Sequence, residues 1–516
     1  MKIVLSNCIF TWYTYINIHA NRFKTRLRIL SIYEERGLIM EENKRGSFGS
    51  TMGFLMAAVG SAVGLGNIWG FPYKMGKNGG FAFLLIYLVL VIFVGFVVMV
   101  GELTIGRKTG LGAVGAYKKL SKRFSWVGWL GVISAFLILC FYCVLGGMVL
   151  RYMVGYVIAI FGGDGWAGAD TGFFSFLLYD FRGMIIFFAI FLVLNCLIVM
   201  GGVKGGIEKF STIAMPALFV ILVAIVIYVA CQDGAGAGYA FMFKPDFTFF
   251  ESTKSFFDVF KTAAGQMFFS LSLGMSAMIT YGSYLPKNEH IQKNAVIICI
   301  SDTLVALLAG MAVMPACAAF GVDYGAGPGL LFHSMQTVFA NMGSIGNFIG
   351  FLFYLLVFIA AITSSISLLE GVSSTAIDKR ILKGKSPRRK TITIIFAVII
   401  FIVGLPVALD ALGSGSAAVK NPAELFGFVG DAVRGWNDCW LDFYDMISEG
   451  ILMPLGALVM SLLIGWYLKT KSVKEECELS GAKFKGYLFF DICFKIVVPI
   501  IMAVVLFAQI ESFFIG

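Results

Sequence analysis

Glycines interrupt an apolar stretch near the amino-terminal end of the chain. Residues 60–72 read GSAVGLGNIWGFP, which puts Gly60, Gly64 and Gly66 within seven positions. Glycine costs about 1 kcal/mol relative to alanine inside a helix, so this density favours either a close helix contact or a break in the helix. The spacing of Gly60 and Gly64 alone fits close helix packing. A break would instead free carbonyls and amides for a ligand.

A second stretch of the same kind lies farther along the chain. Residues 265–274 read GQMFFSLSLG, again with glycine and serine inside an apolar segment. Paired interrupted segments at corresponding positions of two halves indicate the central site of a transporter. The two stretches together therefore favour broken helices whose peptide groups meet a ligand.

Asp302 is a carboxylate inside an apolar segment, with Ile300 and Leu304 on either side. A charged group of this kind is expensive in a membrane, so it needs a cationic partner or a functional task. The alternative is a protonated aspartic acid that is hydrogen-bonded to Gln266.

The elements that must position these residues are membrane helices. Of the 516 residues, 59% are apolar or aromatic and only 14% are charged, which excludes a soluble enzyme. Uncharged runs of about 20 residues, long enough to cross a bilayer, recur along the chain. They predict an all-α polytopic membrane protein with about eleven spans, near residues 51–73, 80–105, 125–160, 184–200, 207–231, 256–284, 292–319, 345–377, 391–410, 446–468 and 487–511.

The charged residues lie in loops and predict the orientation of the chain. The net charge of +10 does not indicate nucleic-acid binding, because the basic residues are not gathered on one domain. Lys and Arg concentrate between spans two and three and between spans eight and nine, which places those loops in the cytoplasm. The amino terminus is then cytoplasmic and the carboxyl terminus extracytoplasmic. The ten cysteines and three histidines show no metal-binding spacing.

The first 44 residues differ in composition from the rest. We expect residues 1–44 to be an extension that is disordered or outside the native start, with translation beginning at Met40; a cytoplasmic or interfacial segment is the alternative. Residues 45–512 then form one domain, with a first half at 45–235, a second half at 250–470 and a last helix at 483–512.

Four separated motifs resemble the neurotransmitter:sodium symporter family. They are residues 60–72, residues 204–216 (KGGIEKFSTIAMP), residues 265–284 and residues 363–365 (TSS). The resemblance covers about residues 45–512 and points to the prokaryotic amino-acid branch. It implies the LeuT-like fold, in which spans one to five and six to ten form a 5+5 inverted repeat with broken first and sixth helices.

The resemblance also implies two sodium sites built from hard oxygen ligands. The first would use Ala62, Asn67, Ser270 and Asp302 with the substrate carboxylate, and the second Gly60, Val63, Ala360, Thr363 and Ser364. Each hydroxyl taken singly could instead bond to its own helix. Many family members have asparagine at Asp302, and chloride-dependent relatives offset the sodium charge with chloride near this position. We expect Asp302 to supply that negative charge, so that chloride is not required.

Relatives that carry monoamines have an aspartate where Gly64 stands, so we expect a substrate that brings its own carboxylate. That carboxylate would meet the amides of Leu65 and Gly66 at a half-helix amino terminus. The pocket is apolar and uncharged, which favours a neutral, hydrophobic amino acid; leucine, methionine, tyrosine and tryptophan stay open. The substrate-binding residues that the resemblance implies are Ala62, Gly64, Leu65, Gly66, Ile138, Tyr142, Phe269, Ser270, Ser272, Met275, Ser364 and Leu368.

The gates that the resemblance implies consist of an inner ion pair and an outer group. Their residues are Arg45 and Asp378 inside, and Phe269, Tyr142 and Asp445 outside. The outer pair lacks its arginine because Gly70 occupies that position. Either Lys74 or Arg434 substitutes for it, or the aromatic residues close the outer path alone.

The expected function is import of an amino acid with sodium ions by alternating access across the plasma membrane. The expected partners are the amino acid, sodium and the lipid bilayer, and a homodimer is left open. A proton-coupled transporter of the same fold and a non-transporting amino-acid sensor are the alternatives. A membrane enzyme would need an intramembrane nucleophile with its base or a metal cluster, and the sequence contains no such set.

Overall fold

The computed structural model describes residues 46–162, 173–250, 252–323, 330–410, 412, 418–426 and 439–514. Within these ranges every regular element is a helix. The predicted extension over residues 1–44 and the residues Arg45 and Arg434 lie outside the described residues.

Nine helices of the described residues are long and apolar enough to cross a membrane. They are Phe81–Thr109 (α4, Phe81–Leu90, and α5, Phe96–Thr109), α7 (Val127–Ile160), α9 (Phe181–Met200), Val203–Ala230 (with α10, Lys209–Ala230), α14 (Ile291–Ala319), α16 (Gly346–Ile381), α17 (Arg389–Leu409), Trp440–Tyr467 (with α19, Trp440–Asp445, and α20, Met453–Leu462) and Tyr487–Glu511 (with α22, Tyr487–Ile492, and α23, Val498–Phe514). Shorter helices lie between them, namely α6 (Ala113–Leu120), α8 (Phe173–Tyr179), α11 (Ala235–Phe243), α15 (Met335–Asn341), α18 (Pro422–Phe426) and α21 (Lys471–Glu478).

Two further spans are broken. The first consists of α2 (Thr51–Ala62) and the helix Gly66–Lys77, which includes α3 (Phe71–Lys77) and is inclined to α2 by 45°. The second consists of α12 (Thr253–Ser270) and α13 (Ala277–Gly282). The nine helices and the first pair make up to ten candidate spans among the described residues, and α12 with α13 lies where an eleventh was predicted, near residues 256–284. The prediction of an all-α membrane protein with broken first and sixth helices is confirmed.

Each break has a local cause in the sequence. Val63 caps α2 in an extended conformation (ψ 105°), and Gly64 follows where a side chain would collide with Ser364 and Tyr142. In the second break, Ser272, Gly274 and Ser276 have φ angles of 53°, 75° and 64°. Such left-handed residues end a helix, because continuing it requires negative φ. The glycines and serines that marked these stretches in the sequence therefore lie at the interruptions themselves.

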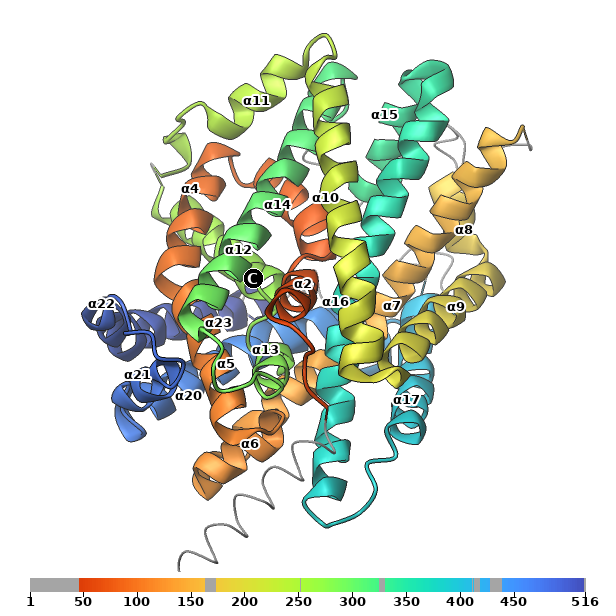
Figure 1. The fold of residues 1–516 in the computed structure, drawn as a ribbon. Coiled ribbons are helices and arrows are strands. Elements are labelled where there is room, and N and C mark those ends of the chain that lie inside the picture. Colours follow the sequence, from red (N-terminus) through yellow and green to blue (C-terminus); the bar gives the residue numbers. More distant parts are fainter. Residues whose placement is uncertain are drawn as a thin grey trace, which may run out of the picture.

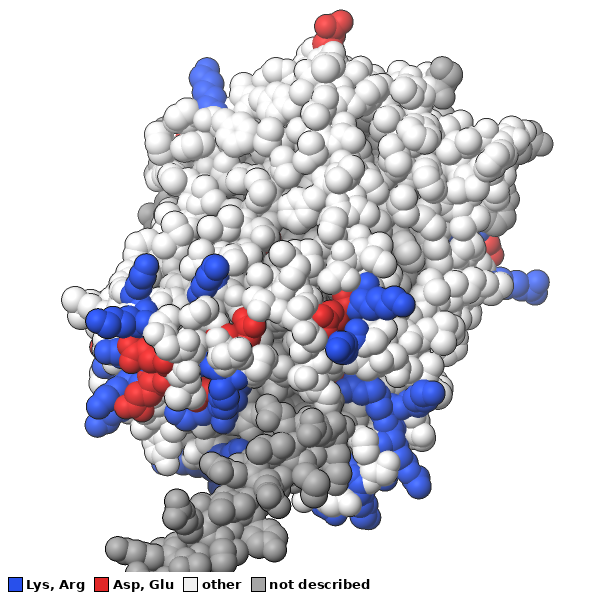
Figure 2. Space-filling model, in the orientation of Figure 1, with Lys and Arg blue, Asp and Glu red and all other residues white. Residues whose placement is uncertain are grey.

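Burial separates an inner bundle from a peripheral set of helices. About 83% of the most apolar window of the α7 span is buried, against 28% for α17. The broken helix α2 lies near the centre, packed against α10, α14 and α16 (Figure 1). On the face seen in Figure 2, most charged side chains lie in the lower half and the upper part is almost entirely uncharged. The breaks are thus enclosed by other helices, as irregular backbone in a membrane must be.

Candidate functional site

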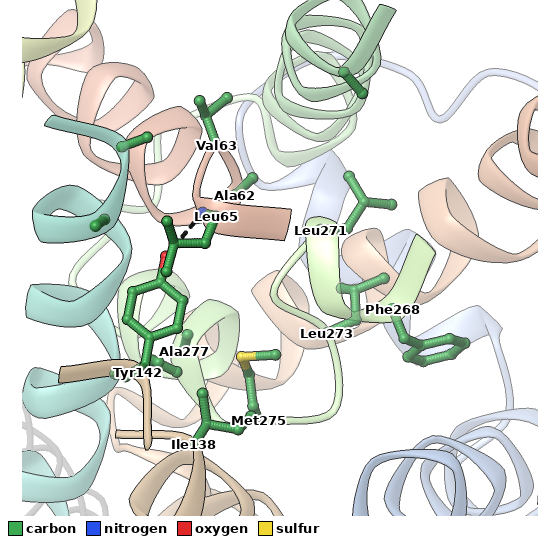
Figure 3. Close-up of a cluster of buried hydrophobic side chains, with 14 of the residues drawn as sticks. Ala62, Val63, Leu65, Ile138, Tyr142, Phe268, Leu271, Leu273, Met275 and Ala277 are labelled. Atoms are coloured by element: carbon green, nitrogen blue, oxygen red, sulfur yellow. Dashed lines mark hydrogen bonds between the residues drawn. The ribbon is translucent and has the colours of Figure 1, made fainter. Parts of the chain in front are cut away.

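The first break presents a backbone amide to a tyrosine of α7. The amide of Leu65 donates a hydrogen bond to the Tyr142 hydroxyl over 3.0 Å. Figure 3 shows this contact, with Ile138 and Met275 beside the tyrosine ring. The neighbouring Gly64 amide donates to the Asn67 side-chain oxygen over 2.9 Å. The amide and the phenol predicted to hold a carboxylate are therefore adjacent.

A small cavity of about 20 Å³, which we call the central cavity, lies between the two breaks. Its wall is formed by Ser61, Ala62, Gly64, Gly66, Ile138, Tyr142, Phe269, Ser272, Met275, Ser364 and Leu368. Ten of these are among the twelve residues predicted to bind substrate; Leu65 and Ser270 are not part of the wall, and Ser61 was not predicted. None of these eleven described residues has a charged side chain. Its volume is close to that needed by one water molecule, so an amino acid would have to displace flexible walls such as Met275 and Phe269.

The first predicted sodium site is a hydrogen-bonded cluster around Asp302. One carboxylate oxygen accepts hydrogen bonds from the Asn67 amide (2.7 Å) and the Ser270 hydroxyl (2.9 Å). The other accepts a hydrogen bond from the Tyr87 hydroxyl over 3.2 Å. Asp302 is fully buried, and in the described part of the chain no basic side chain forms an ion pair with it. A bound cation or a proton could balance its charge.

Two neighbours of this cluster differ from expectation. Gln266, the expected partner of a protonated Asp302, donates instead to the Gly66 carbonyl over 2.7 Å. Its side-chain oxygen is buried and has no hydrogen-bond partner among the residues that the structure describes. Tyr87 was not predicted at all, because a tyrosine in a continuous apolar run resembles any other core aromatic. Only the structure shows that its hydroxyl donates a hydrogen bond to Asp302.

The second predicted sodium site lies between α2 and α16. The Ser364 hydroxyl lies 3.3 Å from the Gly60 carbonyl oxygen and 3.1 Å from that of Val63. The Thr363 hydroxyl donates to the Ala360 carbonyl over 3.1 Å. All five predicted residues thus lie in neighbouring turns of these two helices. The same hydroxyls also satisfy helix carbonyls, which is the ordinary alternative for such residues.

A larger cavity of about 410 Å³ lies on the other side of Phe269, which borders both spaces. We call this cavity the outer vestibule, after the outer gate that the sequence analysis predicts at Phe269 and Asp445. Its wall includes Gly70, Lys74, Gln266, Asp442, Asp445 and Glu449. The Lys74 ammonium is 3.2 Å from a Glu449 carboxylate oxygen, and both side chains are largely buried. Lys74 therefore pairs with Glu449, one helical turn beyond the predicted acidic residue Asp445.

Two buried carboxylates, Asp378 and Glu102, accept hydrogen bonds from backbone amides. A carboxylate oxygen of Asp378 accepts a hydrogen bond from the Gly112 amide over 2.7 Å, while its predicted partner Arg45 is outside the described residues. Glu102 is buried on α5 and accepts a hydrogen bond from the Gly274 amide over 2.7 Å. It thereby holds the second break in place.

Two broken helices, enclosed hydroxyls and carbonyls, and a central cavity beneath a vestibule define a secondary transporter. The sequence matches the model of the sodium:neurotransmitter symporter family over residues 45–164 and 180–416. The chain belongs to this family, and it is a sodium-dependent transporter and not an enzyme.

Individual relatives agree with this assignment. The uncharacterized sodium-dependent transporter YhdH of Bacillus subtilis is 36% identical over 473 residues, covering 90% of this chain and 98% of that protein. The sodium-dependent neutral amino acid transporter B(0)AT2 of Bos taurus is 26% identical over 56% of this chain and 44% of its own length. The crystal structure of MhsT in complex with L-phenylalanine has 35% identity and a TM-score of 0.78, and covers 90% of this chain and 99% of that chain. The predicted family and the LeuT-like fold are confirmed.

Charge exchange tests the pair in the outer vestibule. We expect Lys74→Gln and Glu449→Gln each to lower sodium-driven uptake roughly tenfold, because removal of one partner leaves a largely buried charge unpaired. Exchange of the two charges, K74E with E449K, should restore part of the rate. Uptake by proteoliposomes of equal protein content measures this. Lys261→Gln, which removes the partly buried partner of Asp258, is the control. Additive effects in the exchanged variant would show that Lys74 and Glu449 do not act as a pair.

Proposed function

We propose that this chain imports a neutral, hydrophobic amino acid together with sodium across the plasma membrane by alternating access. The observation that supports this most directly is the cavity between the breaks, in which a hydroxyl and backbone groups adjoin an apolar, uncharged wall. A substrate carboxylate would lie at Tyr142 and the Leu65 amide. Its side chain would pack against Ile138, Met275 and Leu368. The phenylalanine in MhsT and the substrate class in the name of B(0)AT2 favour the same chemistry.

Two sodium ions would accompany the substrate. One would bind among Asn67, Ser270 and Asp302 beside the substrate carboxylate, and the other between α2 and α16 at Thr363 and Ser364. Two ions moving down a tenfold gradient and about 100 mV release roughly 7 kcal/mol, enough for about five tenfold steps of accumulation if coupling is tight. The Asp302 carboxylate would make chloride unnecessary.

The alternation itself would use both ends of the site. In the described residues the vestibule reaches Phe269 from one side, whereas Glu102 and Asp378 are bonded to backbone amides at the other. Rearrangement of the broken helices would close the vestibule and open a path at Glu102 and Asp378. By the distribution of basic loops, the vestibule would face outward and the amino terminus inward.

Uptake into proteoliposomes tests this function. We expect an imposed sodium gradient to drive uptake of one or a few of the twenty labelled amino acids, all of them neutral and apolar. Replacement of sodium by potassium should reduce uptake to the level of protein-free liposomes. Equal uptake with either cation, or uptake driven only by a proton gradient, would contradict the proposal.

Met275 offers a test of substrate size. It is 2% exposed and lines the central cavity, where its flexible side chain can yield to a large substrate. We expect Met275→Phe to lower the ratio of tryptophan to leucine uptake roughly tenfold, since a misfit in an apolar pocket costs about 1–3 kcal/mol. Competition of both amino acids against one labelled substrate measures the ratio. Met460→Phe, on α20, is the control. An unchanged ratio would place the side chain of the substrate elsewhere.

A further inference from the structure

A third cavity, of about 540 Å³, lies where the start of α14 meets the segment between α21 and α22. Its wall is formed by His290, Ile291, Gln292, Lys293, Val296, Ile297, Cys477, Ser480, Ala482, Lys483, Phe484 and Lys485. None of these residues lines the central cavity or the outer vestibule. The transport mechanism therefore does not account for this space, which we call the basic cavity.

The lining of the basic cavity is both cationic and apolar. Lys293, Lys483 and Lys485 border it, and none of the described residues in its wall is Asp or Glu. In the described part of the chain none of the three ammonium groups forms an ion pair. Val296 and Phe484 contribute apolar surface between the lysines. This combination fits a ligand with an anionic head and an apolar body.

The wall of the basic cavity is held in place by specific contacts. The side chain of Gln292 donates to the Lys485 carbonyl over 2.6 Å and accepts from the Lys485 amide over 3.0 Å. The Phe484 amide donates to Glu478 over 3.1 Å, and the Phe484 ring packs against that of Phe490. The segment is thus bound to α14 and to α22, so that its lysines are kept at the rim.

The basic cavity opens beside a face of α14 that is partly exposed among the described elements. Val296, Ile300 and Leu304, spaced four residues apart on one face of the helix, are 39%, 62% and 46% exposed. Because α14 is a membrane-spanning helix, these side chains face lipid. Figure 2 shows Lys side chains interspersed with Asp and Glu over α21 and α22, at the lower left of the molecule. The cavity therefore lies at the boundary between this charged surface and the apolar belt, and the three lysines are the charged residues that line it.

We propose that the basic cavity binds an anionic phospholipid of the adjacent leaflet. The lysines would pair with its phosphate, and an acyl chain would follow Val296, Ile300 and Leu304. Basic pockets at helix ends on the positively charged side of membrane proteins recognise anionic head groups in this way. A zwitterionic phospholipid adds a choline cation, which the three lysines disfavour. Charge complementarity thus selects the anionic lipid.

Native mass spectrometry of the full chain in detergent tests this binding. We expect one phosphatidylglycerol to stay bound under conditions that remove phosphatidylcholine with the same acyl chains. The triple variant K293Q/K483Q/K485Q should bind phosphatidylglycerol roughly 100-fold more weakly, at about fivefold per lysine. The control K379Q/K383Q/K385Q removes three exposed lysines from the end of α16 and the loop that follows it, and should bind like the unchanged protein.

A second variant tests the cavity without changing its charge. Ala482→Trp places a large side chain at the lining, so that it should displace the bound lipid while every lysine remains. Phosphatidylglycerol bound equally by this variant would overturn the proposal. Equal retention of both lipids by the unchanged protein would do the same. A second copy of the chain as the occupant would appear as a dimer that Ala482→Trp dissociates, and this outcome would also overturn it.

Discussion

Gly64→Ala is expected to reduce sodium-driven uptake roughly 100-fold. A Cβ atom at this position would lie 2.4 Å from the Ser364 hydroxyl oxygen and 2.8 Å from that of Tyr142. Both hydroxyls belong to the proposed binding sites, so neither can withdraw without loss of a ligand. Overpacking of a tight core costs about 1–3 kcal/mol, and here the displaced atoms are the functional ones. Initial rates of uptake in proteoliposomes measure the effect.

Gly236→Ala is the matched control for this variant. Gly236 lies in α11, and among the described residues a Cβ there would meet nothing within 4 Å beyond its chain neighbours and its own helix backbone. The same chemical change should therefore leave uptake unaltered. Elution of both variants as single species in size-exclusion chromatography separates a local defect from misfolding. Full activity of Gly64→Ala would show that Ser364 and Tyr142 move freely, and it would remove the geometric basis of both sites.

The breaks could be predicted from the sequence because glycine and serine are unusual inside apolar spans. Gly64 lies where the chain approaches other groups closely, and Gly274 adopts a positive φ. Such residues are easy to recognise within an apolar run. The wall of the central cavity was also largely predicted, but for another reason. The motifs fixed the register of the helices against those of the family, and ten of the twelve residues follow from that register.

Contacts between distant side chains could not be predicted in the same way. Lys74 and Glu449 are 375 positions apart, and periodicity within either helix carries no information about the other. The expected acidic residue, Asp445, lies one turn away from Glu449 on the same span. The sequence does not show which of these two carboxylates Lys74 contacts. Tyr87 was missed because an aromatic residue in an apolar run has many equivalent roles. The basic cavity depends on how a loop folds back on α14, which composition does not determine.

Asp302→Asn is expected to make transport depend on chloride. The unchanged protein should take up substrate equally in sodium chloride and sodium gluconate, because Asp302 itself would balance the sodium charge. The variant should lose roughly 100-fold of its uptake in gluconate, since a buried cation without a counter-charge costs several kcal/mol. Chloride should restore part of the rate, because the Tyr87 and Ser270 hydroxyls that now donate to Asp302 can donate to an anion instead.

The same variant separates the two interpretations of Asp302. Asn67 and Ser270 donate to one of its carboxylate oxygens, which suits an ionised acid better than a protonated one. If the acid were protonated and structural, asparagine would replace it with little loss, and uptake would be similar in both salts. Asp258→Asn makes the same change at a partly exposed ion pair away from this cluster, and its uptake should be indifferent to the anion. Loss of uptake by the unchanged protein in gluconate would overturn charge substitution, because chloride would then be needed although the carboxylate is present.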